Sequence, residues 1–407
     1  MPDTLKGNLI VGQSGGPTAV INASLAGVVQ EALKHSEIGS VYGMLHGIEG
    51  VLKEELIDLG KESPDTIELL KQTPSAALGS CRHKLTDKDY DRILTVLKAH
   101  GIRYFMYIGG NDSADTTARI SRLAQETGYE LRAMGIPKTI DNDLAFTDHC
   151  PGYGSVARFV AEAVRGAGLD TEAIGVVDTV KVIEMMGRNA GWITAAAALA
   201  RIDGDPDTAP HLIYVPERRI VMDKLLDDVQ KVYDRLGYCV IALCEGARGE
   251  DGDLLSATGG ALYTDSFGHK QLGGAADYLC RVIADRLKLK ARFDKPGTIQ
   301  RMMQSQQSPV DVEEAYTVGA TAVQKAVAGT SGYMVTLVRQ SNDPYRWTTG
   351  LARLEDVANA ERLMPDEFLN AEGNNVTQAF LDYARPLIGP PLPPVARLKK
   401  YMVAKKA

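Results

Sequence analysis

The 407-residue sequence contains few cysteines and no long apolar segment. Its five cysteines are an odd number and form no CxxC pair, which argues against a disulfide framework and against a zinc site. No apolar run approaches the roughly 20 residues that a membrane-spanning helix needs; the run at 193–200 is predicted to be buried helix. We therefore expect reduced thiols, no membrane partner and, because the N-terminus lacks signal-peptide features, a cytoplasmic location.

Positive charge is also scarce, because 45 lysines and arginines stand against 52 aspartates and glutamates, giving a net charge of −7. Nucleic-acid binding usually requires a basic face, so this balance predicts no nucleic-acid partner. Any bound anion must then be held by local basic residues that act against the overall field. The chain is too long for one comfortable hydrophobic core, which favours two domains.

Strand-like and helix-like segments alternate for nearly 300 residues. Apolar runs predict strands at 8–12, 102–110, 130–137, 173–179, 211–216 and 238–246. Amphipathic or apolar stretches predict helices at 17–35, 86–101, 113–128, 155–168, 189–202, 221–237 and 311–329. This alternation predicts an α/β fold of two Rossmann-like αβα domains with mostly parallel sheets. Ligands of such folds bind at the carboxyl ends of the strands.

The domain break is placed near residue 149. Residues 1–148 and about 300–345 form the predicted first domain, to which the helix at 311–329 returns. Residues 149–299 form the predicted second domain. Residues 346–407 include a proline cluster and are expected to pack as an extension outside the sheets.

The first turn with a chemical pattern is GQSGGPTAVINA (12–23), which joins a predicted strand to a helix. Backbone N–H groups at Gly15 and Gly16 can face an anion there, aided by the helix dipole. A tight turn that needs a positive φ angle is the alternative. The pattern is neither a Walker A motif nor GxGxxG, which lowers the chance of a P-loop enzyme or a simple dinucleotide binder.

Two further loops carry charge where an anion could bind. In LGSCRHKL (78–85), Arg82 and Lys84 form a possible two-pronged phosphate contact, although a solvated surface loop explains them equally well. In YIGGNDS (107–113), a strand again ends in two glycines before a helix, but Asp112 places a carboxylate where an anion would be repelled.

The turn PKTIDND (137–143) combines Lys138, Thr139, Asp141 and Asp143. A carboxylate beside a lysine suits a base that deprotonates a hydroxyl while the lysine neutralises phosphoryl charge. A structural turn in which aspartates cap backbone amides is the alternative.

Three weaker motifs could supply contacts to a phosphorylated polyol. EMMGRNAGW (184–192) offers Gly187 and Arg188, and CEGARG (244–249) places Glu245 at the end of an apolar strand. ARFDKPGTIQR (291–301) offers Arg292 and Arg301, nine residues apart.

The order of these motifs over residues 8 to 330 resembles the phosphofructokinase family, and TIDND together with MGR is specific to it. The resemblance implies two αβα domains with the active site in the cleft between them. It also implies a glycolytic transfer of a phosphoryl group to the 1-hydroxyl of fructose 6-phosphate. Because sites in this family borrow residues across subunits, the resemblance implies a homodimer or homotetramer, in which Arg292 reaches a neighbouring site.

Roles carry over by matching positions. Asp141 would be the catalytic base, assisted by Thr139, Lys138 and Asp112. The residues matched to donor binding are Gly15, Gly16, Arg82, Gly110 and Ser113. The residues matched to sugar-phosphate binding are Thr139, Asp141, Met186, Gly187, Arg188, Glu245, Arg292 and Arg301.

The donor is inferred from two positions. ATP-using members mostly carry glycine where this chain has Asp112 and Lys138, whereas members that use diphosphate resemble this chain. Asp112 would lie where the α-phosphate of ATP must pass. Two like charges about 4 Å apart cost roughly 4 kcal/mol at an effective dielectric constant near 20, or about a thousandfold in affinity. Diphosphate has no α-phosphate and escapes this cost, so the leading hypothesis is a diphosphate–fructose-6-phosphate 1-phosphotransferase.

One departure concerns the metal. The family implies Mg²⁺, but Asn111 replaces the aspartate that holds it, and a neutral amide binds a hard cation more weakly than a carboxylate.

Two alternatives stay open: an ATP-dependent 6-phosphofructokinase, and a non-catalytic sugar-phosphate-binding regulator, which Asn111 favours. Sedoheptulose 7-phosphate is a reasonable second substrate.

Overall fold

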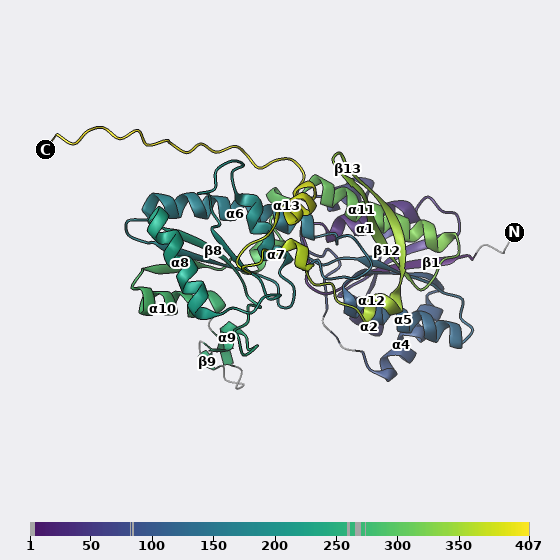
Figure 1. The fold of residues 1–407 in the computed structure, drawn as a ribbon. Coiled ribbons are helices and arrows are strands. Elements are labelled where there is room, and N and C mark those ends of the chain that lie inside the picture. Colours follow the sequence, from purple (N-terminus) through teal and green to yellow (C-terminus); the bar gives the residue numbers. More distant parts are fainter. Residues whose placement is uncertain are drawn as a thin grey trace.

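The computed structural model describes residues 5–81, 83, 85–258, 261–264, 270–272 and 274–406. Two lobes lie side by side, each built around one sheet (Figure 1). The sheet of the first lobe has the strand order β13-β12-β5-β4-β1-β2-β3, and that of the second has the order β11-β6-β8-β7. The predicted α/β fold with mostly parallel sheets is confirmed.

The first sheet is parallel at its centre, where β1, β2, β4 and β5 pair with one another. Strand β4 is apolar and buried along almost its whole length, because helices cover both faces. The strands of the first sheet are β1 (Gly7–Gln13), β2 (Ile38–Met44), β3 (Leu56–Asp58), β4 (Ile102–Gly109), β5 (Arg132–Pro137), β12 (Tyr333–Asn342) and β13 (Tyr345–Arg353). Its helices are α1 (Ile21–Ala32), α2 (Ile48–Lys53), α3 (Pro64–Leu70), α4 (Asp87–Ala99), α5 (Asn111–Glu126), α11 (Pro309–Val327) and α12 (Leu354–Ala358).

Helix α11 packs beside α1 although nearly 300 residues separate them in the sequence (Figure 1). Leu25 and Val28 of α1 share a buried cluster with Val318 and Ala322 of α11 on one face of the first sheet. Helices α4 and α5 cover the other face. Helix α4 begins after Thr86 in a capping box.

The second sheet consists of four parallel strands, β6 (Val180–Met185), β7 (Leu212–Tyr214), β8 (Cys239–Cys244) and β11 (Ala291–Asp294). Helices α8 (Met222–Leu236) and α10 (Ala275–Leu287) cover one face. Helices α6 (Tyr153–Ile174) and α7 (Trp192–Ala195) cover the other. A short helix α9 (Leu255–Thr258) and a ribbon of β9 (Ala261–Thr264) and β10 (Lys270–Leu272) lie between β8 and α10 in the chain.

Several predicted elements have different bounds. The strand predicted at 173–179 is wrong, because α6 continues to Ile174 and the strand is β6. Val176 is 95% exposed, so the apolar side chains of that stretch do not enter the core. The first helix begins at Ile21 and not at Pro17, and the helix at 192–195 continues only as a 3₁₀ turn to Ala200.

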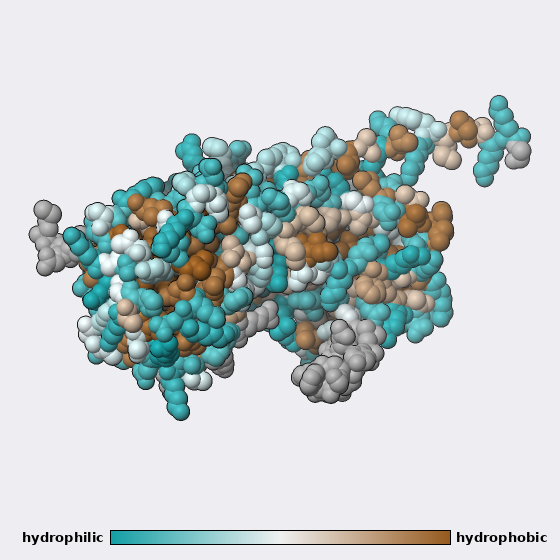
Figure 2. Space-filling model, turned by 180° about the vertical axis from the view of Figure 1, so that it is seen from behind, coloured by the Kyte–Doolittle hydropathy of each residue, from teal (hydrophilic) through white to brown (hydrophobic). Residues whose placement is uncertain are grey.

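The C-terminal segment differs from the prediction of an extension outside the sheets. Strand β13 pairs with β12 and forms an edge of the first sheet. Helix α13 (Gln378–Ala384) places Phe380 and Tyr383 in the core of the second lobe. The last residues leave the body as an extended chain that carries both hydrophilic and hydrophobic residues (Figures 1 and 2). Within the described residues, no helix has the length and apolar character needed to cross a bilayer.

Candidate active site

The carboxyl ends of three neighbouring strands bring three of the predicted turns together. In the parallel register Gln13 lies beside Ile108, and Gly109 lies beside Pro137. The glycine turn after β1, the start of α5 after β4 and the TIDND turn after β5 therefore share one edge of the first sheet. Three turns that lie far apart in the sequence form one surface.

Lys138 directly follows β5 at this edge and is almost completely buried. Its Nζ atom donates a hydrogen bond to the carbonyl oxygen of Gly16, 2.8 Å away. A Cβ atom on Gly15, which has a φ angle of +75°, would lie 3.1 Å from the same Nζ atom. Burial lowers the pKa of Lys138 to about 8; the charge of Asp141 opposes this shift and that of Arg301 adds to it. At neutral pH the lysine is therefore still mostly protonated, although it holds its proton less firmly than an exposed lysine does.

Asp141 follows three residues later. Burial raises the pKa of its carboxyl group to about 6, and the negative charges of Asp143 and Glu245 act in the same direction. Lys138 and Arg301 oppose the shift. A carboxylate whose pKa lies close to neutrality is suited to accept a proton from a hydroxyl group.

Thr139 shapes the turn that carries this carboxylate. Its Oγ1 atom accepts a hydrogen bond from the backbone N–H of Asp141, 3.1 Å away. Its own backbone N–H donates to the carbonyl of Pro151, so the turn is tied to the chain that leads into α6. Thr139 thus stabilises the conformation of the turn through hydrogen bonds of its side chain and its backbone.

The second lobe contributes two interlocked turns at the ends of β6 and β8. The N–H of Gly187 donates to Oε1 of Glu245 at 3.3 Å, and the N–H of Glu245 donates to the carbonyl of Met185. A Cβ atom on Gly246 would lie 1.9 Å from the carbonyl oxygen of Arg188, so only glycine fits. Met186, Gly187 and Glu245 therefore form one group, with the Arg188 side chain exposed beside them.

Arg301 connects the two lobes. It ends a 3₁₀ turn (Gly297–Arg301), and a Cβ atom on Gly16 would lie 2.6 Å from its Nη1 atom. The preceding residue, Gln300, is buried and accepts a hydrogen bond from the N–H of Met186. The guanidinium group thus lies against the glycine turn of the first lobe while its neighbour holds the MGR turn of the second.

The start of α5 supplies the remaining polar groups. Gly110 precedes the helix, and its carbonyl accepts hydrogen bonds from the N–H groups of Ser113 and Ala114. The Asp112 side chain is exposed in the first turn, where the helix dipole also stabilises a negative charge. The Oδ1 atom of Asn111 is buried and has no hydrogen-bond partner in the described part of the chain.

Several predicted residues stand apart. Arg82 and Lys84 lie outside the described residues. Arg292 pairs in register with Lys181, well before the end of β6, and forms an ion pair with Asp178 at 2.8 Å. It therefore does not join the other sugar-phosphate candidates within this chain.

Two residues near the site were missed from the sequence. The Oγ atom of Ser80 donates a hydrogen bond to the carbonyl of Gly15 at 2.6 Å, and Gln300 holds Met186 as described above. Both lie inside predicted binding motifs, beside the arginines Arg82 and Arg301. Small polar residues beside the charged ones were the available signal.

A hollow of about 650 Å³ lies elsewhere, beside α5 and the end of β13. Arg122, Arg132 and Arg353 line it, but each forms an ion pair with Glu130 or Glu355. Each of these arginines already has a carboxylate partner, and Arg122 and Arg353 share Glu355. None of the motifs singled out in the sequence lines this hollow, so the strand ends are the stronger candidate site.

Comparison with known proteins places this geometry in a family. Residues 8–326 match the phosphofructokinase family. A pyrophosphate–fructose 6-phosphate 1-phosphotransferase of Halomonas elongata is 44% identical over 419 residues, covering 98% of each chain. A sulfofructose kinase of Alkalicoccus urumqiensis is 33% identical and covers 95% of this chain and 96% of its own. The crystal structure of a pyrophosphate-dependent phosphofructokinase from Marinobacter aquaeolei superposes with a TM-score of 0.86, at 41% identity and 98% coverage of both chains. The chain belongs to the phosphofructokinase family.

Proposed function

We propose that this chain reversibly transfers a phosphoryl group from diphosphate to the 1-hydroxyl of fructose 6-phosphate. The products are fructose 1,6-bisphosphate and phosphate. Relatives at 43–44% identity over nearly the full chain are named for this reaction. The observation that carries the proposal is the buried Lys138 Nζ atom, hydrogen-bonded to the glycine turn and electrostatically coupled to Asp141.

In the proposed reaction Asp141 accepts the proton of the sugar 1-hydroxyl. The sugar oxygen forms a bond to one phosphorus atom, and the bond from that phosphorus to the bridging oxygen breaks as phosphate leaves. Lys138 and the backbone N–H groups near Gly15 offset the negative charge that moves to the leaving phosphate. The pKa of Asp141, about 6, allows the carboxyl to take up this proton and release it near neutral pH.

Enzymes of this family generally use a divalent metal, and we propose Mg²⁺. The described residues contain no cluster of three or more His, Cys, Asp or Glu side chains that would hold a metal. The buried Oδ1 atom of Asn111 is an oxygen ligand of the kind that Mg²⁺ accepts, and diphosphate oxygens would complete the shell. When bound, the metal supplies positive charge to the transferring phosphoryl group.

Donor selection is assigned to Asp112. Its carboxylate is exposed at the start of α5, and the neighbouring Gly110 lies close to the carbonyl of Lys138. A donor that extends past the second phosphorus would bring another negative charge against this carboxylate. Diphosphate ends before that point, so the same residue tolerates the short donor.

The sugar phosphate is assigned to the residues that line the junction of the lobes. Met186, Gly187, Arg188 and Glu245 come from the second lobe, and Arg301 connects them to the donor turn. Arg292 lies apart from them, and we propose that it serves the site of a neighbouring copy in a homodimer or homotetramer.

All five cysteines are free thiols, which suits a reducing compartment such as the cytoplasm.

The test is a stoichiometry measurement. Purified protein is incubated with fructose 6-phosphate, diphosphate and Mg²⁺, and the products are followed by phosphorus NMR. We expect one phosphate for each fructose 1,6-bisphosphate, and re-formation of diphosphate when the products are supplied. Sugar-phosphate binding without turnover on any donor would show a regulator and would overturn the proposal.

A further inference from the structure

Residues 361–388, named here the C-terminal strap, lie beyond the part of the chain that matches the family. The strap contains α13 and contributes Phe368, Phe380 and Tyr383 to the core of the second lobe. Its polar groups do not face only this core. They reach the turns on both sides of the candidate active site.

The TIDND turn contains a residue that cannot reach a substrate. Asn142 is completely buried and has a φ angle of +57°. Asparagine tolerates this left-handed conformation better than most residues, but it still needs support. The backbone N–H of Cys150 donates to Oδ1 of Asn142 at 2.9 Å. The conformation of the residue next to Asp141 is therefore fixed partly through a side-chain amide.

The nitrogen of the same Asn142 side-chain amide is bound by the C-terminal strap. Nδ2 of Asn142 donates to the hydroxyl of Tyr383 at 2.9 Å, across 241 positions of sequence. The same hydroxyl donates to the carbonyl of Asp148 at 2.9 Å. The hydroxyl thus joins the TIDND turn to the chain that follows it, and its capacity to donate is used in full.

The strap also contacts the turns by backbone groups. The N–H of Arg362 donates to the carbonyl of Asp143 at 2.8 Å, and its carbonyl accepts from Nε1 of Trp192 at 3.2 Å. Oε1 of Glu361 accepts from the side chain of Asn189 at 3.0 Å. One short stretch is therefore bonded both to the TIDND turn of the first lobe and to the MGRN turn of the second.

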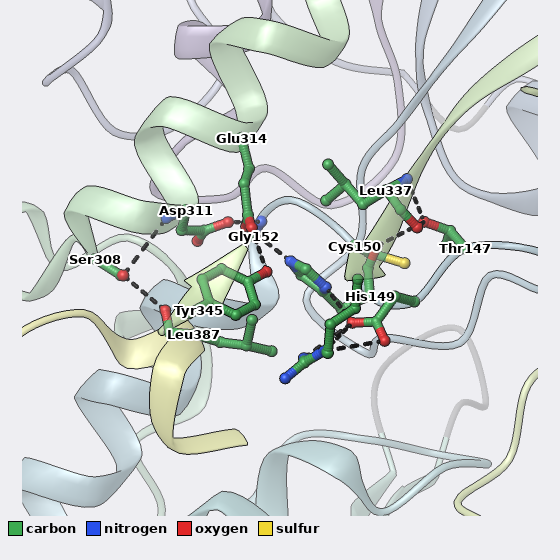
Figure 3. Close-up of polar contacts among 12 residues, drawn as sticks. Thr147, His149, Cys150, Gly152, Ser308, Asp311, Glu314, Leu337, Tyr345 and Leu387 are labelled. Carbon is green, nitrogen blue, oxygen red and sulfur yellow. Dashed lines mark hydrogen bonds and ion pairs between the residues drawn. The ribbon is translucent and has the colours of Figure 1, made fainter. Parts of the chain in front are cut away.

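A buried ion network anchors the chain between the turn and α6 (Figure 3). His149 lies between the carboxylates of Asp148 and Glu314, each 2.7 Å from a ring nitrogen. Arg339 pairs with Asp148, and the Tyr345 hydroxyl donates to Glu314. This network fixes the segment on which Asn142 and Tyr383 converge, so a change at Tyr383 acts on a rigid frame.

We propose that Tyr383 is a positioning residue, which sets the location of the catalytic carboxylate through the buried side chain of Asn142. This inference rests on the proposed function, because it takes Asp141 to be the base. The hydroxyl touches neither substrate. It acts by holding the turn in the one conformation that aims Asp141, so its removal lowers kcat and leaves substrate binding largely intact.

The test uses three variants and one matched control. Tyr383→Phe removes the hydroxyl but keeps the ring that packs on Trp192. Asn142→Gly keeps access to a positive φ angle but removes both hydrogen bonds, and the double variant combines the changes. Tyr153→Phe is the control, because its hydroxyl is also buried in the same cluster and, among the residues that the structure describes, bonds to the carbonyl of Trp192 and not to the TIDND turn.

We expect Tyr383→Phe to lower kcat about tenfold to a hundredfold relative to Tyr153→Phe, with the KM values of both substrates within about twofold. The loss in the double variant should be clearly smaller than the sum of the two single losses, because both changes remove the hydrogen bond that Asn142 and Tyr383 share. Equal kcat values for Tyr383→Phe and Tyr153→Phe, or additive losses in the double variant, would overturn the inference.

A second readout does not depend on turnover. Amide hydrogen exchange of residues 139–143, measured by mass spectrometry, should be faster in Tyr383→Phe than in Tyr153→Phe. Unchanged exchange contradicts the inference even if the wild-type protein proves inactive. A wild-type protein without turnover, but with faster exchange in Tyr383→Phe, would count against the proposed function and leave the positioning role supported.

Discussion

The Nζ atom of Lys138 donates a hydrogen bond to the carbonyl oxygen of Gly16, and 2.8 Å separates the two atoms. This bond joins the end of β5 to the turn after β1, across the intervening strand β4. It also places an ammonium group of lowered pKa in the glycine turn. The relationship brings positive charge to one turn of a chain whose net charge is −7.

Replacing Lys138 by methionine should affect the activity and the stability of the protein differently. Burial lowers the pKa of this lysine from its usual value to about 8, so at pH 7 the charged form is less favourable in the folded than in the unfolded protein. We expect Lys138→Met to lower kcat with diphosphate about a hundredfold or more. The melting temperature should stay equal or rise. Lys181→Met, which removes a lysine paired with Asp294 away from the turn, serves as the control. A large loss of stability without loss of kcat would contradict this role.

Asp141→Ser tests the base. Without a proton acceptor, turnover should fall by about 10²–10⁴-fold, while calorimetry should show fructose 6-phosphate binding of similar affinity. In the wild-type protein kcat should fall as the pH drops below about 6, because protonation removes the acceptor. A variant that retains activity within about tenfold of wild type means that another group takes the proton.

Asp112→Gly tests the donor filter. Removing the exposed carboxylate at the start of α5 should raise kcat/KM for ATP by about tenfold or more, because the like-charge repulsion disappears. The value for diphosphate should change much less. Asp115→Gly, one turn along the same helix, is the control for a change in helix charge. If ATP is used no better after Asp112→Gly, the carboxylate is not the filter.

The raised pKa of His149 should make the stability of the folded protein depend on pH. Burial favours the neutral ring, but the charges of Glu314 and Asp148 outweigh it and raise the pKa of His149 to about 9. A raised pKa contributes stability that is complete below the unfolded value, about 6.5, and is lost as the pH rises through about 9. The free energy of unfolding in urea should therefore decrease from pH 6.5 to pH 9.5, and less so in His149→Gln.

The control for this experiment is a second buried histidine. Burial lowers the pKa of His211 to about 4, so His211→Gln should leave the alkaline loss of stability unchanged. An unchanged alkaline loss in His149→Gln would show that the ring is not charged in the folded protein.

The strand-end turns were predictable because their signal is local. Glycines and charges such as Lys138 and Asp141 directly follow apolar runs, and parallel topology gathers such turns at one edge. The bounds of β6 were not predictable from apolar character, since Val176 and Val177 are β-branched yet exposed. Local sequence reports propensity, and burial is decided by the whole fold.

The role of the C-terminal strap could not be predicted either. Asn142 and Tyr383 are 241 positions apart, and no sequence pattern around either residue indicates that the two are in contact. The proline cluster nearby suggested an outer extension, whereas α13 lies in the core. Contacts of this kind depend on long-range packing that no spacing rule records.

The central claim is that the chain uses diphosphate as its phosphoryl donor. Its most direct test is the ratio of kcat/KM for diphosphate to kcat/KM for ATP, measured with fructose 6-phosphate at matched free Mg²⁺. The account predicts a ratio of about a thousand or more in favour of diphosphate, the factor expected from one like-charge contact at Asp112. A ratio at or below one would contradict it and would identify the chain as an ATP-dependent member of the family.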